Sequence, residues 1–265
     1  LPPGRVVLAR AYPLHGRAIR LDEGIDLRTT AQEGKLTWTA PAGRWRVLAI
    51  TRTNLFEGTH AEGNYWQKLP YPNLLEAAPT ARFLELTHDR YARELGPELG
   101  RAFPATFTDE PSLMSMFLRR MPYRPLPWSE GLVRRFRERH GYEVDTILPA
   151  LVTEVEPGAA RYRHDFWSTV GELVAENYFG QIQTWCRAHG MKSGGHLLAE
   201  EGLTSHVTLY GDMLRCLRRM DAPGIDCLTS LPADVPWYIA RLAASAAELD
   251  GQRWVMCETS DHAQV

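Results

Sequence analysis

Two hydrophobic periods alternate along the chain after residue 79. Apolar side chains that recur every three or four positions predict helices at residues 79–95, 129–141, about 159–189 and from 236 onward, with a helical turn near 212–219. Short apolar runs between them predict strands at residues 103–110, 191–198, 224–228 and 253–257. An alternation of helix and short strand is typical of an α/β fold whose strands run parallel.

The first 57 residues follow a different pattern. Short apolar or alternating runs predict strands at residues 5–10, 18–21, 36–40 and 44–50. We therefore predict a small antiparallel β unit at residues 1–57 and a partial (β/α)8 TIM-barrel domain at residues 58–265. Four strands after residue 79 cannot close an eight-stranded barrel, so we expect an incomplete barrel, truncated at one or both ends.

The composition narrows the classes of partner. The chain has 265 residues, of which 44% are hydrophobic, and this permits a sizeable core. Its formal net charge of −2 indicates neither a nucleic-acid partner nor a membrane surface, and no apolar run reaches the length of a membrane span. The chain opens without a signal peptide or an initiator methionine, so we expect the rest of a longer parent chain as a partner.

The cysteines exclude some metal and redox sites. No C-x-x-C pair occurs among Cys186, Cys216, Cys227 and Cys257, which argues against zinc-finger and thioredoxin-like sites. We interpret all four as buried thiols and leave a disulfide open.

Carboxylates follow or end three of the predicted strands. The predicted strand at 103–110 begins with an apolar run and ends at two carboxylates, Asp109 and Glu110. It cannot extend further, because Pro111 cannot continue a strand ladder. Glu200 and Glu201 follow the next strand, and Glu258 follows the last, with Asp226 in the strand between them. The carboxyl ends of barrel strands converge on one pocket, where paired carboxylates can serve glycoside cleavage. Taken singly, each glutamate is equally compatible with a solvated loop.

Metal and nucleophile chemistry is the alternative. His196, His206 and His262 suggest a metal hydrolase, but the chain has no H-x-H pair and no H-E-x-x-H motif. We therefore predict no transition-metal ligands and no required cofactor, and leave open a calcium ion held by carboxylates and carbonyls. A P-loop and a G-x-S-x-G motif are also missing from the sequence.

Several motifs resemble one family. They are Phe83-x-x-x-Thr87-His88-x-x-Tyr91, Phe107–Pro111, Gly141-Tyr142, Leu148–Leu151, Arg163-x-Asp165-Phe166, Trp185-Cys186-x-x-x-Gly190, Gly195-His196 with Glu200 and Glu201, and Pro223–Asp226. Their order and spacing over about residues 40–262 resemble the α-L-rhamnosidase family of barrel glycoside hydrolases. The resemblance implies a barrel catalytic domain, an acid supplied by the Asp109-Glu110 strand end, and a calcium ion near the sugar. Family members are much longer and carry β-sandwich domains.

These observations assign roles to named residues. Glu110 is the expected general acid, and Glu201 or Glu258 the base or nucleophile. Asp109, His196, Asp226 and His262 are expected to bind the sugar or orient the acid. Tyr123 and Trp128 follow the acid's strand and are expected to stack on a sugar, although Trp128 is equally suited to packing beneath its loop.

The reaction's stereochemistry and even catalysis itself stay open. If Glu110 ends a fourth barrel strand, Glu258 ends the seventh, and that count favours a retaining mechanism. The family resemblance favours inversion, which also suits Glu201. The competing interpretation is a carbohydrate-binding protein that keeps the pocket without the chemistry.

Overall fold

The computed structural model describes residues 1–54, 71–113, 123–227 and 236–259. The chain divides into two compact units, and two of the borders between them fall within helices α3 (Glu130–His140) and α5 (Ala159–Val174). One unit comprises residues 1–56, 121–125 and 133–166, and the other comprises residues 57–120, 126–132 and 167–265. The predicted domain border after residue 57 stays a prediction.

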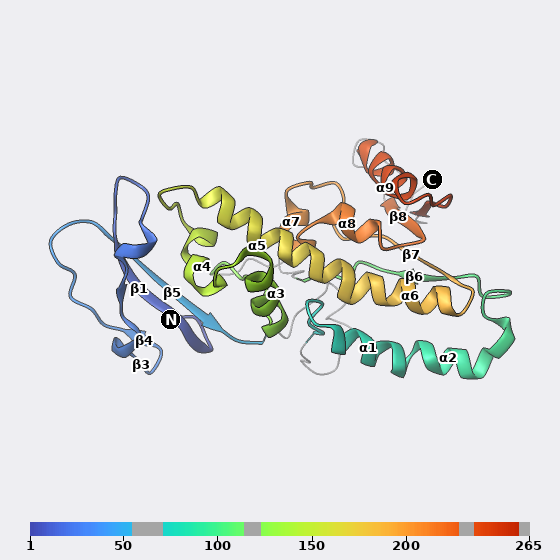
Figure 1. Ribbon diagram of the computed structural model, residues 1–265, viewed down its shortest axis with the longest axis horizontal. Helices are drawn as coiled ribbons and strands as arrows, with labels where there is room; N and C mark the ends of the chain where they lie inside the picture. The colour runs from blue at the N-terminus through green and yellow to red at the C-terminus, as the bar shows by residue number, and fades with distance from the viewer. Residues whose placement is uncertain (55–70, 114–122, 228–235, 260–265) are drawn as a thin grey trace, which may run out of the picture. The chain divides into compact units, whose positions relative to one another are not determined.

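The first unit is built on an antiparallel sheet. β1 (Arg5–Pro13) pairs with β2 (Ile25–Asp26) on one side and with β5 (Trp45–Arg52) on the other (Figure 1). β3 (Ala31–Gln32) and β4 (Lys35–Leu36) form a separate short hairpin, and 3-10 turns lie at Leu21–Glu23 and Arg28–Thr30. The predicted strands at 5–10 and 44–50 are confirmed. The one at 18–21 is wrong, because only single bridges at Ala18 and Ile19 form there.

Helix α4 (Val144–Val152) completes this unit with the C-terminal part of α3 (Glu130–His140) and the start of α5 (Ala159–Val174). Tyr12 and Ile19 are fully buried and pack with Ala150 and Val155. The sequence patterns did not predict α4, whose interior proline, Pro149, argues against a helix.

The second unit is built on a curled, four-stranded parallel sheet, half of a barrel, in the order β6-β7-β8-β9. Its strands are β6 (Ala105–Thr108), β7 (Lys192–Gly195), β8 (Ala222–Cys227) and β9 (Met256–Thr259). The order matches the order along the chain, which is the commonest arrangement of consecutive β-α-β units. All four predicted strands are therefore confirmed, with boundaries shifted by a few residues.

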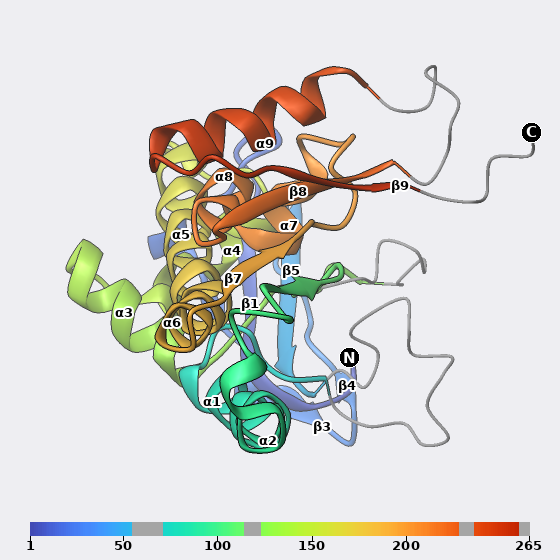
Figure 2. The same ribbon diagram turned by 90° about the vertical axis from the view of Figure 1, so that its right-hand side faces the viewer.

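Helices cover one side of this sheet, as the second view shows for α6, α8 and α9 (Figure 2). The helices of this unit are α1 (Ala77–Leu86), α2 (His88–Leu95), α6 (Gln181–Ala188), α7 (Ser205–Tyr210), α8 (Met213–Leu217) and α9 (Tyr238–Leu249). A 3-10 turn at Gly96–Glu98 follows α2, and a π-helical segment, Ala175–Gly180, joins α5 to α6. Among the described residues, no helix has the length and apolar character needed to cross a membrane.

Side-chain caps mark the starts of two helices. Ser129 Oγ accepts the N–H of Leu132 at 3.0 Å, so the predicted N-cap is confirmed. Asp212 caps α8 in the same way through the N–H of Arg215 at 3.0 Å. The single helix predicted at 79–95 is wrong, because the helix is interrupted at Thr87, with φ −113° and ψ −72°, and is divided into α1 and α2.

Phe107, in β6, is 48% exposed, because the described residues leave that face of the strand uncovered. The expectation that all four cysteines are buried is wrong. Cys257 is exposed and Cys227 half-buried, whereas Cys186 and Cys216 are buried as predicted. All four cysteines are free thiols.

Candidate active site

Two carboxylates of the site, Asp109 and Glu110, lie at the C-terminal end of β6. Asp109 and Glu110 follow Thr108 directly, and Glu110 has a φ of +44°. A non-glycine residue in this left-handed region is strained, and such strain collects at functional sites. The side chain of Asp109 is 59% exposed, so a ligand can reach it.

A close approach between β6 and β7 places His196. Gly195 has a φ of +144°, and a Cβ at that position would lie 2.1 Å from the carbonyl oxygen of Thr108. The next residue, His196, donates its N–H to the same oxygen at 3.1 Å. Only glycine permits this contact, which brings His196 beside the end of β6.

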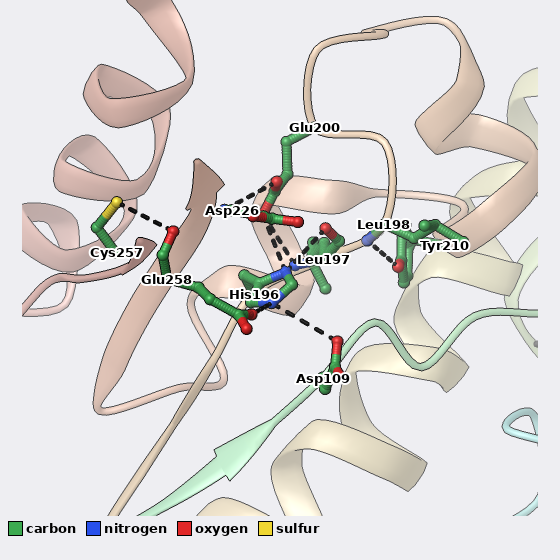
Figure 3. A network of polar contacts seen from close by, with 9 residues as sticks. All are labelled: Asp109, His196, Leu197, Leu198, Glu200, Tyr210, Asp226, Cys257 and Glu258. Atoms are coloured by element: carbon green, nitrogen blue, oxygen red, sulfur yellow. Dashed lines mark hydrogen bonds and ion pairs between the residues drawn. The ribbon is translucent and has the colours of Figure 1, made fainter. Parts of the chain in front are cut away.

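The imidazole of His196 is the centre of the site (Figure 3). Its Nε2 lies 2.6 Å from Glu258 Oε2 and 3.7 Å from Asp109 Oδ1. Its Nδ1 lies 3.8 Å from Glu200 Oε1 on the opposite side of the ring. The ring is 1% exposed, and the ring of Phe107 lies 5.5 Å away between centroids.

The surrounding carboxylates change the protonation of His196. Burial lowers the pKa of the ring, but the charge of Glu200 and the hydrogen bond to Glu258 outweigh burial, so the pKa is raised. A protonated imidazole donates a charge-assisted hydrogen bond to a carboxylate. Glu258, with a side chain 35% exposed, is therefore both held by His196 and open to a ligand.

The remaining carboxylate comes from the neighbouring strand. Asp226 in β8 is the register partner of Glu258 in β9, so both side chains project from the same face of the sheet. Glu110, His196 and Asp226 each place a polar side-chain atom within 4.8 Å of the others. Carboxylates from the ends of β6, β8 and β9, and Glu200 from the segment after β7, therefore surround the imidazole of His196.

Comparison with known proteins identifies the family of the chain. The model of the family described as alpha-L-rhamnosidase matches residues 9–264. The chain belongs to the alpha-L-rhamnosidase family. The resemblance seen in the sequence motifs is thereby confirmed.

Two relatives of this rhamnosidase-family chain are much longer. A protein from Formosa agariphila, named as a candidate beta-glucuronidase, is 24% identical over 162 residues, which are 60% of this chain and 13% of that protein. The solved structure of a rhamnosidase from Novosphingobium sp. PP1Y matches with a TM-score of 0.58 and 23% identity, over 93% of this chain and 23% of that one. The latter likeness shows the fold.

The polar side chains of this cluster lie close enough together to hold a metal ion. Asp109, His196 and Glu258 bring one ligand atom each within 4.8 Å of the others, as does the set with Glu110 and Asp226. Carboxylate oxygens are the donors that calcium prefers, whereas an imidazole is not, and His196 Nε2 is already bonded to Glu258. The carboxylates of this cluster therefore fit a hard cation, with His196 as their hydrogen-bond partner.

The other predicted residues lie elsewhere or cannot be placed. Glu201 is exposed, and its backbone carbonyl accepts the hydroxyl hydrogen of Tyr238. Trp128 is half-buried and its carbonyl accepts a hydrogen bond from Asn73 at 2.9 Å, while Tyr123 belongs to the other compact unit. His262 lies outside the described residues.

Sequence reasoning gave no role of its own to two residues at the site. Glu200 is 4% exposed and lies beside His196, and Tyr210 is fully buried and accepts the N–H of Leu198 at 2.6 Å. The doublet Glu200-Glu201 showed that a carboxylate follows this strand, but not which of the two faces inward. Tyr210 belongs to α7, a helix too short to leave a periodic signal.

Proposed function

We propose that this chain is the catalytic part of a glycoside hydrolase that removes a terminal, α-L-rhamnose-like sugar from a polysaccharide or glycoside. The observation that carries the proposal is the meeting of Asp109, Glu110, Asp226 and Glu258 around His196, within a chain of the rhamnosidase family. Because the chain spans 13% and 23% of the two relatives, the active protein is proposed to be longer.

The reaction needs one proton donor and one proton acceptor. Glu110 donates a proton to the glycosidic oxygen as the bond from that oxygen to the anomeric carbon breaks. Glu258 accepts a proton from a water molecule while the water oxygen bonds to the anomeric carbon. Paired carboxylates in these roles are the common arrangement in glycosidases.

The surroundings of Glu258 support its role as the base rather than Glu201. Its carboxylate is hydrogen-bonded to a buried imidazole at 2.6 Å, which fixes its direction. The side chain of Glu201 has no comparable anchor in the described residues and is exposed. A base whose direction is already fixed needs less reorganisation when it removes a proton.

Asp109 and Asp226 complete the polar lining. Asp109 is exposed enough to accept hydrogen bonds from sugar hydroxyls, and Asp226 lies within reach of Glu110. A calcium ion bound by these carboxylates would supply a further electrostatic anchor for sugar hydroxyls. Trp128 is proposed to add an aromatic face for the sugar ring.

The experiment that tests the function uses the full-length protein. A panel of aryl glycosides that includes the α-L-rhamnoside and the β-D-glucuronide should give hydrolysis of the rhamnoside. In Glu110→Gln, kcat should fall far more for an aglycone that is a poor leaving group than for a dinitrophenyl aglycone, which needs no acid. Equal losses on both aglycones would remove Glu110 from the role of acid, and no hydrolysis of any member would reject the function.

The product's configuration tests the mechanism separately. A base that activates water predicts that the first sugar released has the opposite anomeric configuration to the substrate, as proton NMR can follow. Carboxyl groups of inverting enzymes stand about 6.5–9.5 Å apart, and those of retaining enzymes about 5–5.5 Å. A retained configuration, with a glycosyl azide formed by Glu258→Ala in azide, would make Glu258 a nucleophile instead.

A further inference from the structure

The side chain of Glu200 spans two strands at their carboxyl ends. One oxygen, Oε1, accepts the N–H of Leu197 at 3.0 Å, in the segment that follows β7. The other oxygen, Oε2, accepts the N–H of Asp226 at 3.2 Å, in β8. The residue is 4% exposed, so neither backbone group has water as an easy substitute.

The segment that carries Glu200 is tightly constrained. Ala199 has a φ of +58°, a strained value for a residue with a Cβ, and it turns the chain so that Glu200 points back at Leu197. The N–H groups of His196 and Leu198 are also bonded, to the Thr108 carbonyl at 3.1 Å and to the Tyr210 hydroxyl at 2.6 Å. With Glu200 in place, the backbone N–H groups of His196, Leu197 and Leu198 each have a hydrogen-bond acceptor.

Leu197 and Asp226, the two residues that Glu200 binds, lie next to the proposed catalytic residues. Leu197 follows His196, whose ring holds Glu258, and Asp226 is the register partner of Glu258. The same carboxylate lies 3.8 Å from His196 Nδ1. A displacement at either backbone position would therefore move the imidazole, or Asp226, relative to Glu258.

We propose that Glu200 is a positioning residue that joins the end of β7 to β8 and thereby aligns His196, Asp226 and Glu258. The inference rests on the proposed glycosidase function for its kinetic consequence, but the bridge itself is a property of the fold. Burial also raises the pKa of Glu200 to about 7, against the opposing effect of its two N–H bonds.

The chain offers a matched control. Asp221 is another buried carboxylate that joins the same two strands, but near the ends where they begin. It precedes β8 directly, and its Oδ2 accepts the N–H of Ser193 in β7 at 3.1 Å. Its Oδ1 accepts hydrogen bonds from Arg187 at 2.6 Å and Gln183 at 3.2 Å. A loss common to both residues is a loss of stability, whereas a loss particular to Glu200 is a loss of alignment.

The test compares Glu200→Gln with Asp221→Asn in the full-length protein. A glutamine amide has one acceptor oxygen, so it can serve only one of the two N–H groups. At a temperature where both variants are folded, kcat of Glu200→Gln should fall by roughly tenfold to a hundredfold with KM changed little. Deuterium exchange should become faster in peptides containing Leu197 or Asp226. Asp221→Asn should lower the melting temperature without either change.

The outcomes separate the inference from the function. Exchange at both amides equal to the wild type, or equal losses of kcat in the two variants, overturns the positioning role. If the wild-type protein hydrolyses no glycoside, the function fails, and exchange at the two amides alone decides the bridge. If Glu200→Gln does not fold, Glu200→Asp replaces it, because the shorter side chain keeps the charge but cannot span both donors. Wild-type kcat and exchange in Glu200→Asp would then overturn the inference.

Discussion

His196 holds Glu258 through a 2.6 Å contact between Nε2 and Oε2, although the two residues are 62 positions apart in the chain. The contact joins a buried ring to a carboxylate that a ligand can reach. Carboxylates on both sides of the ring favour its protonated form, which makes the hydrogen bond charge-assisted. The carboxylate of Glu258 consequently has a fixed direction.

Removing this imidazole should therefore impair catalysis more than binding. Hydrogen bonds to charged groups are worth about 1.5–3 kcal/mol, so His196→Gln should lower kcat by roughly tenfold to a hundredfold. KM should change less, and steady-state kinetics on an aryl glycoside measures both constants. His189→Gln is the control, because His189 stacks on Trp185 at the end of α6 and is expected to keep wild-type kcat. Equal kcat in both variants would contradict the role of His196.

The contact between β6 and β7 predicts a loss of stability in Gly195→Ala. A Cβ at that position would meet the Thr108 carbonyl oxygen at 2.1 Å, and the φ of +144° is itself unfavourable. The combined cost should be about 2 kcal/mol or more, which corresponds to a fall in melting temperature of about 4 °C or more by calorimetry.

Gly251→Ala is the matched control for this comparison. Gly251 also has a positive φ, +66°, but a Cβ there would have no neighbour within 4 Å. Gly251→Ala should lower the free energy of unfolding by only about 1 kcal/mol, because it adds backbone strain without a steric clash. A similar fall in both variants would show that backbone strain, and not the approach of the two strands, accounts for Gly195.

The first unit should show acid-dependent stability through Asp165. Tyr142 donates its hydroxyl hydrogen to Asp165 Oδ2 at 2.7 Å. Burial raises the pKa of Asp165, but the hydrogen bonds from Tyr142 and His164 and the nearby cations outweigh it, so the pKa lies below its ordinary value of 3.8. The ionised carboxylate thus stabilises the fold above that value, and its contribution is lost as the pH falls through the lowered pKa.

Asp165→Asn tests this dependence. The difference in melting temperature between wild type and variant should be largest near neutral pH and should shrink as the pH falls below about 4. Tyr142→Phe, which removes one donor and keeps the carboxylate, should give a smaller difference with the same direction. A difference that is constant from pH 7 to pH 3 would show that packing rather than charge explains the effect of Asp165.

Trp128 tests the proposed aromatic face. The side chain is half-buried, and its loop is fixed through the bond between Asn73 and the Trp128 carbonyl. If the ring stacks on the sugar, Trp128→Ala should raise KM about tenfold, because aromatic contacts are worth about 0.5–1.5 kcal/mol beyond the area they bury. If instead the melting temperature falls and KM does not change, the ring packs beneath its loop.

The fold was largely predictable because its signals are local. The helix predicted at about 159–189 carries apolar side chains at helical spacing between Phe166 and Cys186. These side chains are buried in a continuous helical segment, as predicted. The break at Thr87 was not predictable from spacing, since both halves of the segment keep the same period. Helix α4 was missed because Pro149 opposes a helix locally, and the packing of Ile147, Leu148 and Ala150 overrides it.

The site was only partly predictable, because a sequence shows which residues end strands but not which of them face inward. Asp109, Asp226, His196 and Glu258 were named from strand ends, and they lie together. The inward position of Glu200 depends on the positive φ of Ala199, a conformation that no pattern in the sequence indicates. Several family motifs, such as Gly141-Tyr142 and Arg163-x-Asp165, lie in the other unit, where Tyr142 bonds to Asp165.

The most direct test of the central claim compares Glu258→Gln with Glu201→Gln in the full-length protein. Glutamine preserves the size of the side chain and removes the carboxylate that is proposed to accept the proton. On an aryl α-L-rhamnoside, kcat of Glu258→Gln should fall by about 100-fold or more, as expected when a general base is lost, whereas Glu201→Gln should change kcat by less than about threefold. Unchanged kcat in Glu258→Gln, or a large fall confined to Glu201→Gln, would contradict the account.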